Sequence, residues 1–183
     1  MKECLYFLAI VPPEPIYTEV AQLKQLVFDQ FESKAALRSP PHITLHMPFK
    51  WKESKEEKLL NSLINFEMSS APFTVELSNF DFFPPKVVFV DVMPDAQLAE
   101  LQSKLVKHVR LELNLFNADY KDKPFHPHMT IAFRDLKKNV FLSAKDYFSE
   151  QSYNAEFIVD GYHLLKHDGK KWNSYRAFKC FGG

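Results

Sequence analysis

The chain has 183 residues, of which 46% are hydrophobic and 25% charged, a balance typical of a globular protein with one sizeable core. Its 23 basic residues (Lys and Arg) equal its 23 acidic residues, so no net positive field attracts long nucleic acid. With only four glycines, the sequence contains no glycine-rich phosphate loop of the Walker or dinucleotide-binding type.

The first apolar segment is too short to cross a membrane. It covers residues 4–11, is followed by two prolines, and does not have the pattern of a signal peptide. The two cysteines lie near opposite ends of the chain, without a metal-binding spacing. We therefore expect a cytoplasmic protein with reduced cysteines and no contact with a membrane.

Strand and helix patterns alternate along the first half of the chain. Continuous apolar runs predict buried strands, and apolar residues that recur every three to four positions predict helices. In chain order we expect a strand at 5–12, a helix at 17–31, a strand beginning at 42, a helix with charged residues at 52–58 and apolar residues at 59–64, and a strand-rich stretch at 73–83.

The second half repeats this order and adds a hairpin around the turn 167–170. The repetition predicts one domain, residues 1–183, built of two pseudo-symmetric lobes with approximate boundaries 1–84 and 85–183. The expected fold class is α+β, in which each lobe is an antiparallel-rich sheet with helices on its outer side and the cleft lies between the lobes. The expected elements are a strand at 87–94, a helix at 97–113, a strand at 128–133, a helix at 143–150 and a strand at 157–165.

Each half contains the same four-residue motif, Pro-His-Ile-Thr at 41–44 and Pro-His-Met-Thr at 127–130. The chain has seven histidines and four threonines, so chance would give on the order of 0.15 His-x-Thr matches even without the preceding proline. The paired motif therefore indicates function, whereas one histidine alone in a strand is more often structural.

Two imidazoles and two hydroxyls around one point suit the chemistry of a phosphodiester. Because alternate side chains of a strand share a face, His42 projects with Thr44 and His128 with Thr130, while the apolar neighbours face a core. One imidazole can remove a proton from the attacking oxygen while the other protonates the leaving oxygen. The threonine hydroxyls can hold the non-bridging oxygens, and the scheme needs no metal ion or other cofactor.

These residues resemble the 2H phosphoesterases, which carry two His-x-Thr/Ser-x motifs with apolar residues at x. The chain looks closest to the bacterial 2′-5′ RNA ligase-like branch, also called RNA 2′,3′-cyclic phosphodiesterases, and the resemblance extends from Leu5 to Phe181. It implies that residues 42 and 128 are the acid/base pair and that the two threonines hold the phosphate. The implied activity is hydrolysis of a 2′,3′-cyclic phosphate, with weak 2′-5′ RNA ligation as the reverse reaction.

Four further residues are candidates for substrate binding. By alternation, His46, His126 and Arg134 share a face with the motif histidines, although solvent exposure is an equally good interpretation of the two histidines. Members of the resembling branch often carry Arg where this chain has Phe133, so the role of Arg134 is open. Tyr6, in the first strand, is placed to stack on a base or to pack in the core.

Two other functions remain open from the sequence. Four histidines, His42, His46, His126 and His128, could form a zinc site, but no carboxylate shares their face and threonine is a poor zinc ligand. The other alternative is a non-catalytic module that binds RNA ends or nucleotides on the same fold. We expect a monomer whose partner is a small nucleotide or an RNA end.

Overall fold

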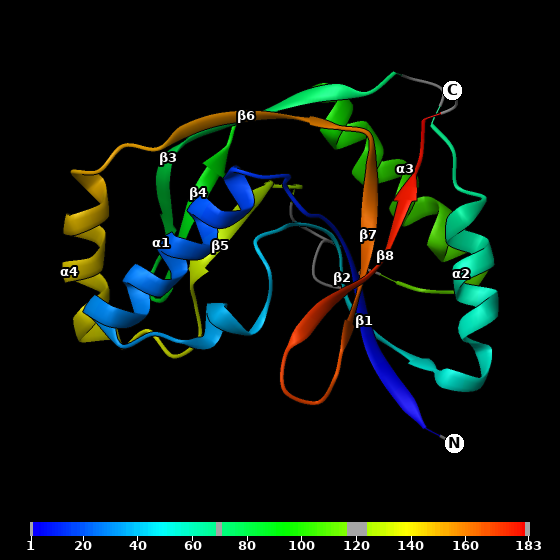
Figure 1. Cartoon of the computed structure of the whole chain (residues 1–183), viewed down its shortest axis with the longest axis horizontal. Coiled ribbons are helices and arrows are strands. Elements are labelled where there is room, and N and C mark those ends of the chain that lie inside the picture. The colour runs from blue at the N-terminus through cyan, green and yellow to red at the C-terminus, as the bar shows by residue number, and fades with distance from the viewer. Residues whose placement is uncertain (1, 69–70, 117–123, 182–183) are drawn as a thin grey trace.

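The computed structural model describes residues 2–68, 71–116 and 124–181, and its strands form two separate antiparallel sheets (Figure 1). The first sheet has the strand order β2-β1-β7-β8 and the second β5-β4-β3-β6. The strands are β1 (Glu3–Ile10), β2 (Ile43–Lys52), β3 (Phe73–Phe83), β4 (Val87–Val92), β5 (His128–Ala132), β6 (Asn154–Val159), β7 (Gly161–His167) and β8 (Trp172–Lys179).

The helices cover the outer face of each sheet. Helices α2 and α3 contact each other and pack on the first sheet, whereas α1 and α4 contact each other and pack on the second (Figure 1). This arrangement confirms the predicted α+β fold with two lobes. Within the described ranges, no helix is both long and apolar enough to span a membrane. The helices are α1 (Ile16–Phe31), α2 (Glu56–Ile64), α3 (Ala96–Leu113) and α4 (Lys138–Ser149).

The lobes are not the contiguous halves 1–84 and 85–183 that the repeat predicts. Strand β3 comes from the first half but pairs with β4 and β6 in the second sheet, while β7 and β8 return to the first sheet, where β7 pairs with β1. The helices are exchanged in the same way, since α1 covers the second sheet and α3 the first. Each lobe is therefore built from both halves of the sequence.

The strand expected at 157–165 is two strands in different sheets. Strand β6 ends at Val159 and β7 begins at Gly161, so Asp160 is the point at which the chain leaves the second sheet. Periodicity did not reveal the break because apolar residues continue on both sides of it. The helix expected at 143–150 is α4, which begins earlier, at Lys138.

Alternation along β1 separates a core face from a second, smaller face. Tyr6, Leu8 and Ile10 point into the main core below the helices. Phe7 and Ala9 point the other way and form a small separate cluster with Leu165 of β7 and, at its margin, Val11 and Trp172. Because the helices cover the first face, the second face is the one left for a site.

Gly161 allows β7 and β8 to approach closely at the start of their pairing. A Cβ atom there would lie 2.0 Å from the carbonyl oxygen of Phe178, which is backbone and cannot rotate away. We expect Gly161→Ala to lower the free energy of unfolding by about 1–3 kcal/mol through overpacking, measured by urea denaturation. Ile158→Ala is the control, since this β6 side chain is 67% exposed. Equal effects of both changes would contradict the steric explanation.

Candidate active site

The two motifs lie on the edge strands of the two sheets. Strand β2 lies at one edge of the first sheet and β5 at one edge of the second, and these two strands contact each other. His42 immediately precedes β2, and His128 is the first residue of β5. The fold therefore brings together two segments that are more than eighty residues apart in the sequence.

The motif histidines have matching hydrogen bonds. His42 Nδ1 lies 2.7 Å from the carbonyl oxygen of Pro40, and His128 Nδ1 lies 2.8 Å from that of His126. A carbonyl oxygen only accepts, so each Nδ1 carries the proton and donates it. In the neutral ring this leaves Nε2 with its lone pair, ready to accept a proton.

The proline of each motif explains which carbonyl oxygen accepts the hydrogen bond from the histidine. The acceptor belongs in both cases to the residue before the motif proline, at positions 40 and 126. A residue that precedes proline is restricted to extended conformations, so its carbonyl direction is constrained. The repeated proline thus helps to orient the repeated imidazole.

A phenylalanine of the adjacent strand supports each imidazole. The ring of Phe7 in β1 lies 4.9 Å from that of His42 at an interplanar angle of 54°. The ring of Phe89 in β4 lies 4.9 Å from that of His128 at 51°. The two motif histidines therefore have the same kind of ring contact with the strand next to them.

Burial makes both imidazoles hard to protonate, but the neighbouring charges differ. Burial, together with the positive charges of Lys24 and His128, lowers the pKa of His42 to about 3, against the effect of the Pro40 carbonyl. Burial also lowers the pKa of His128, and the positive charge of His126 lowers it further, while the hydrogen bond to the His126 carbonyl and the carboxylate of Asp91 act in the opposite direction. Each imidazole thus has a cationic neighbour, and His128 has an anionic neighbour as well.

Both threonines have hydroxyls available to a ligand. Thr44 pairs with Ala9 of β1, and Thr130 pairs with Phe89 of β4, and both side chains are half-buried. Within the described part of the chain, no side-chain hydrogen bond uses either hydroxyl. These hydroxyls therefore lie beside the imidazoles with their donors unused, as the motif predicts.

Lys24 of α1 is a charged group of the site that the sequence did not reveal. Only 2% of it is exposed, and its Nζ donates to the carbonyl oxygens of Ser39 at 2.9 Å and Pro40 at 3.1 Å. It therefore shares the Pro40 oxygen with His42. The only sequence signal was a lysine in the apolar stripe of an amphipathic helix, between Val20 and Val27.

His163 of β7 is a third histidine on the same face. It pairs with Ala9, whose other neighbour across the sheet is Thr44, so the three residues form one row. Its Nδ1 is buried and has no hydrogen-bond partner among the described residues, and burial lowers its pKa. Sequence reasoning missed it because the row depends on the pairing of β1 with β7, which are far apart in the chain.

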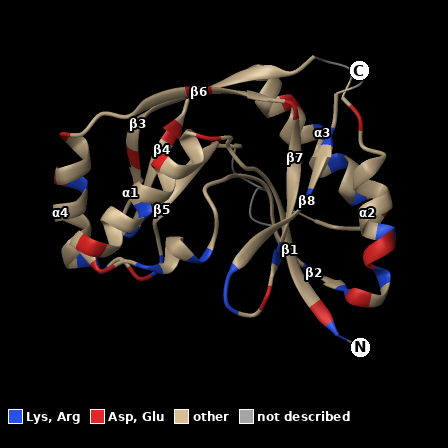
Figure 2. Ribbon diagram, in the orientation of Figure 1, with Lys and Arg blue, Asp and Glu red and all other residues tan. Residues whose placement is uncertain are grey.

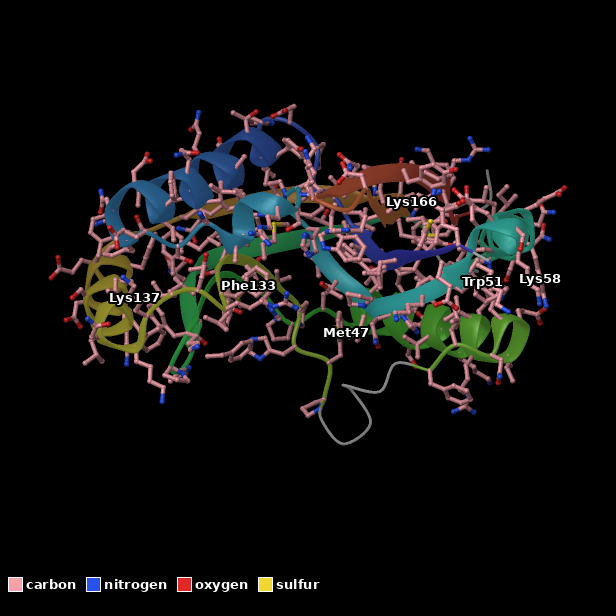
Figure 3. All side chains as sticks on the ribbon, turned by 90° about the horizontal axis from the view of Figure 1, so that it is seen from below. Met47, Trp51, Lys58, Phe133, Lys137 and Lys166 are labelled. Carbon is pink, nitrogen blue, oxygen red and sulfur yellow. The ribbon has the colours of Figure 1, made fainter. Side chains whose placement is uncertain are left out.

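The structure does not place His46 with the motif residues. Its side chain is fully buried, with Nδ1 2.8 Å from the carbonyl oxygen of Met47 and the ring packed edge-on against Phe49. Two register shifts between β1 and β2 interrupt the alternation that the prediction assumed. Met47, labelled in Figure 3, is half-buried instead, so the expected sides of residues 46 and 47 are exchanged.

Tyr6 is also not part of the site. It is fully buried, stacks on Phe49, and donates its hydroxyl hydrogen bond to Glu56 at the start of α2. In β1 the neighbouring Phe7 faces the imidazole, and alternation therefore turns Tyr6 to the core. The core-packing interpretation of this tyrosine is the correct one.

His126 and Arg134 flank the second motif in different ways. His126 is exposed, and its Nε2 lies 3.4 Å from Asp91 Oδ1, beside His128. Strand β5 ends at Ala132, and Arg134 has a positive φ of 60° in the following turn, with its guanidinium over Phe133. The alternation argument for Arg134 is therefore wrong, because the strand does not extend that far.

The four-histidine zinc arrangement is not formed, because His46 points into the core. Across residues 2–68, 71–116 and 124–181, no group of three or more His, Cys, Asp or Glu side chains is placed to hold a metal ion. The candidate active site instead contains two neutral imidazoles with outward Nε2 atoms and two hydroxyl donors. That set can transfer protons and hold an anionic oxygen.

Sequence comparisons place the chain among known proteins. A family model described as the 2′-5′ RNA ligase superfamily matches residues 12–171. A Geobacillus kaustophilus protein provisionally named a phosphoesterase is 28% identical over 176 residues, which cover 94% of each chain. A Bacillus licheniformis protein with the same kind of name is 26% identical over 145 residues, which cover 76% of this chain and 79% of its own.

Two solved structures share the fold. A protein of Thermus thermophilus superimposes with a TM-score of 0.68 at 21% identity, covering 96% of this chain and 97% of its own. The E. coli protein LigT, in a complex with 3′-AMP, superimposes with a TM-score of 0.67 at 18% identity, covering 98% and 99%. At these identities the likeness establishes the two-lobed fold and nothing further.

We expect Lys24→Met to raise the pKa of His42, because the variant removes a positive charge that disfavours the imidazolium. The measurement is an NMR titration of the His42 ring over the pH range in which the protein stays folded. Lys24→Arg keeps the charge and should leave the His42 pKa close to that of the unmodified protein. Titration curves that coincide for Lys24→Met and the unmodified protein would refute the electrostatic coupling.

Proposed function

The chain belongs to the 2′-5′ RNA ligase superfamily, and on this basis we propose that it is a phosphoesterase that hydrolyses a 2′,3′-cyclic phosphate of an RNA end or a small nucleotide. The resemblance stated from the two motifs is thus confirmed at the level of the family. The single observation that carries the proposed activity is the matched placement of His42 and His128, each held through Nδ1 and each with Nε2 outward.

The similar proteins support the substrate class. Relatives from Geobacillus and Bacillus carry the name phosphoesterase, and the structure of E. coli LigT with 3′-AMP is that of a nucleotide complex. The duplicated site suits an in-line displacement at phosphorus, in which the attacking and leaving oxygens lie on opposite sides. One proton acceptor and one proton donor are then needed at the same time.

In the proposed reaction His42 is the general base. Nε2 of the neutral imidazole takes a proton from water as the water oxygen bonds to phosphorus. The Lys24 charge behind the ring favours the neutral form, which is the form that a base needs. We base this assignment on the neighbouring charges, since an anion, Asp91, acts on His128 and only cations act on His42 in the described residues.

His128 is then the general acid. As the bond between phosphorus and the 3′ oxygen breaks, Nε2–H of the imidazolium gives its proton to that oxygen, which leaves a 2′-phosphate. Asp91 favours the protonated form of this histidine. With the 5′ hydroxyl of a second RNA in place of water, the same proton transfers give a 2′-5′ linkage, as a weak second activity.

The threonine hydroxyls stabilise the charge that develops on phosphorus. Thr44 and Thr130 stand two residues after the histidines on strands that contact each other, so their hydroxyls can donate to the two non-bridging oxygens. Phe7 and Phe89 fill the space behind the imidazoles and restrict their rotation. No step in this scheme requires a metal ion.

We expect His42→Ala and His128→Ala each to lower the turnover of a 2′,3′-cyclic nucleotide by at least about 100-fold, because each variant removes one proton-transfer group. Turnover is measured by chromatography of the product, with and without a chelator. His108→Asn is the matched control, since this histidine lies between α3 and α2 and bonds to Ser62.

Each outcome of this experiment separates the candidate functions. Full turnover by either alanine variant would refute the assignment of the two histidines. Tight binding without turnover by the unmodified protein would identify a nucleotide-binding module. Loss of activity with chelator would favour a metal hydrolase.

We expect a bell-shaped pH profile, whose basic limb moves to lower pH in Asp91→Asn. Activity falls as pH rises through the pKa of the acid, and the Asp91 carboxylate holds the pKa of His128 up, so its removal lowers that pKa. The profile of kcat against pH measures the shift. Asp146→Asn, at an exposed position of α4, should leave the profile unchanged. If Asp91→Asn moved the acidic limb instead, the roles of the two histidines would be reversed.

A further inference from the structure

A cavity lies beside the first motif, and the proline of that motif, Pro41, is part of its lining. It has a volume of about 270 Å³ and lies between α1, the segment from the 3₁₀ helix η1 (Ala35–Arg38) to Pro41, and the hairpin of β7 and β8. We call it the basic cavity. The lining residues used below are Tyr17, Lys24, Arg38, Pro40, Lys171 and Trp172.

The basic cavity has three cationic side chains and no carboxylate in its lining, in a chain whose total charge is zero. Arg38 and Lys171 are exposed, and within the described residues neither side chain forms an ion pair. Asp168 of the hairpin binds the backbone amides of Lys170 and Lys171. Figure 2 shows basic segments of η1 and of the hairpin on facing sides of the gap between the lobes.

The third cation, Lys24, is buried, and no counter-ion contacts it among the described residues. Its two hydrogen bonds use carbonyl oxygens, at 2.9 Å and 3.1 Å, so one of the three ammonium protons has no acceptor in this part of the chain. Burial lowers its pKa to about 7 because the desolvated charge is not compensated. An anion in the cavity would supply both the missing charge and the missing acceptor.

The basic cavity adjoins the candidate active site through two contacts. Pro40 lines the cavity, and its carbonyl oxygen accepts from both Lys24 and His42. Trp172 lines the cavity as well, and its ring lies 4.7 Å from Phe7, which in turn packs on His42. A substrate chain whose reacting end lies at His42 can therefore continue into this cavity.

We infer that the basic cavity binds an RNA phosphate next to the reacting end, so that the preferred substrate is an RNA end of two or more nucleotides. The inference rests on the proposed function, since it concerns the substrate of that site. The cavity is slightly smaller than the range of about 300–1,000 Å³ typical of small-molecule pockets, which suits one nucleotide unit. The rings of Tyr17 and Trp172 offer faces on which a base can stack.

The kinetic test compares a 2′,3′-cyclic mononucleoside phosphate with a dinucleotide that ends in the same group. We expect a KM at least about tenfold lower for the dinucleotide, because charge-assisted hydrogen bonds to its phosphate are added. In Arg38→Ala/Lys171→Ala this difference should disappear, while the kinetics on the mononucleoside stay unchanged. The control Lys107→Ala/Arg110→Ala also removes one lysine and one arginine, here from exposed positions of α3. This control should keep the difference in KM between the two substrates.

A binding measurement makes the test independent of turnover. Adenosine 5′-monophosphate is titrated into each protein by calorimetry, and its affinity should fall at least about tenfold in Arg38→Ala/Lys171→Ala alone. If the unmodified protein hydrolyses neither cyclic substrate, the proposed function fails, while this titration still decides whether the cavity binds phosphate.

Three outcomes would overturn the inference. Equal KM values for the two substrates together with no effect of Arg38→Ala/Lys171→Ala on the titration would exclude a phosphate site. Equal losses in this variant and in its control would attribute the effect to net charge. Binding that depends on Arg38 and Lys171, without any advantage of the dinucleotide, would assign the cavity to a free nucleotide and would contradict the assignment to the RNA chain.

Discussion

The geometry of the candidate site depends on one repeated constraint, the hydrogen bond from each motif histidine to the carbonyl before its proline. It fixes the ring plane and the tautomer together, so that both outward nitrogens are Nε2. The phenylalanine behind each ring limits the remaining rotation. A phosphorus atom between two such rings meets groups whose orientation is set before it binds, and this pre-organisation is what proton transfer requires.

Most of the elements could be predicted from the sequence, but not their partners. Periodicity is a local property, and it identified β1, α1, β4 and α3 close to their observed bounds. The exchange of strands between lobes depends on the pairing of β1 with β7 and of β3 with β6, across long stretches of chain. No local pattern encodes such pairing, and for that reason the lobe boundaries and the strand at 157–165 were wrong.

The difference between local patterns and long-range pairing also explains which residues of the candidate site could be predicted. The motif pairs needed only alternation within a few residues, and the structure places them on edge strands that contact each other. The predictions for His46 and Arg134 failed for two reasons. For His46 the alternation was assumed to continue through the register shifts between β1 and β2, and for Arg134 beyond the end of β5. Lys24 and His163 were missed because their position beside the motif residues is created by packing and register between distant segments.

The exchange of segments between the lobes has a consequence for the order in which the protein forms during synthesis. Strand β1 is made before the other strands of the two sheets, yet its neighbour β7 is made only after every strand of the second sheet. Until then one edge of this central strand has no backbone partner, and such an edge is prone to pair with other chains. Strands β1 and β2 therefore cannot mature co-translationally as a separate unit, and the first sheet is completed only after β7 and β8 have been made.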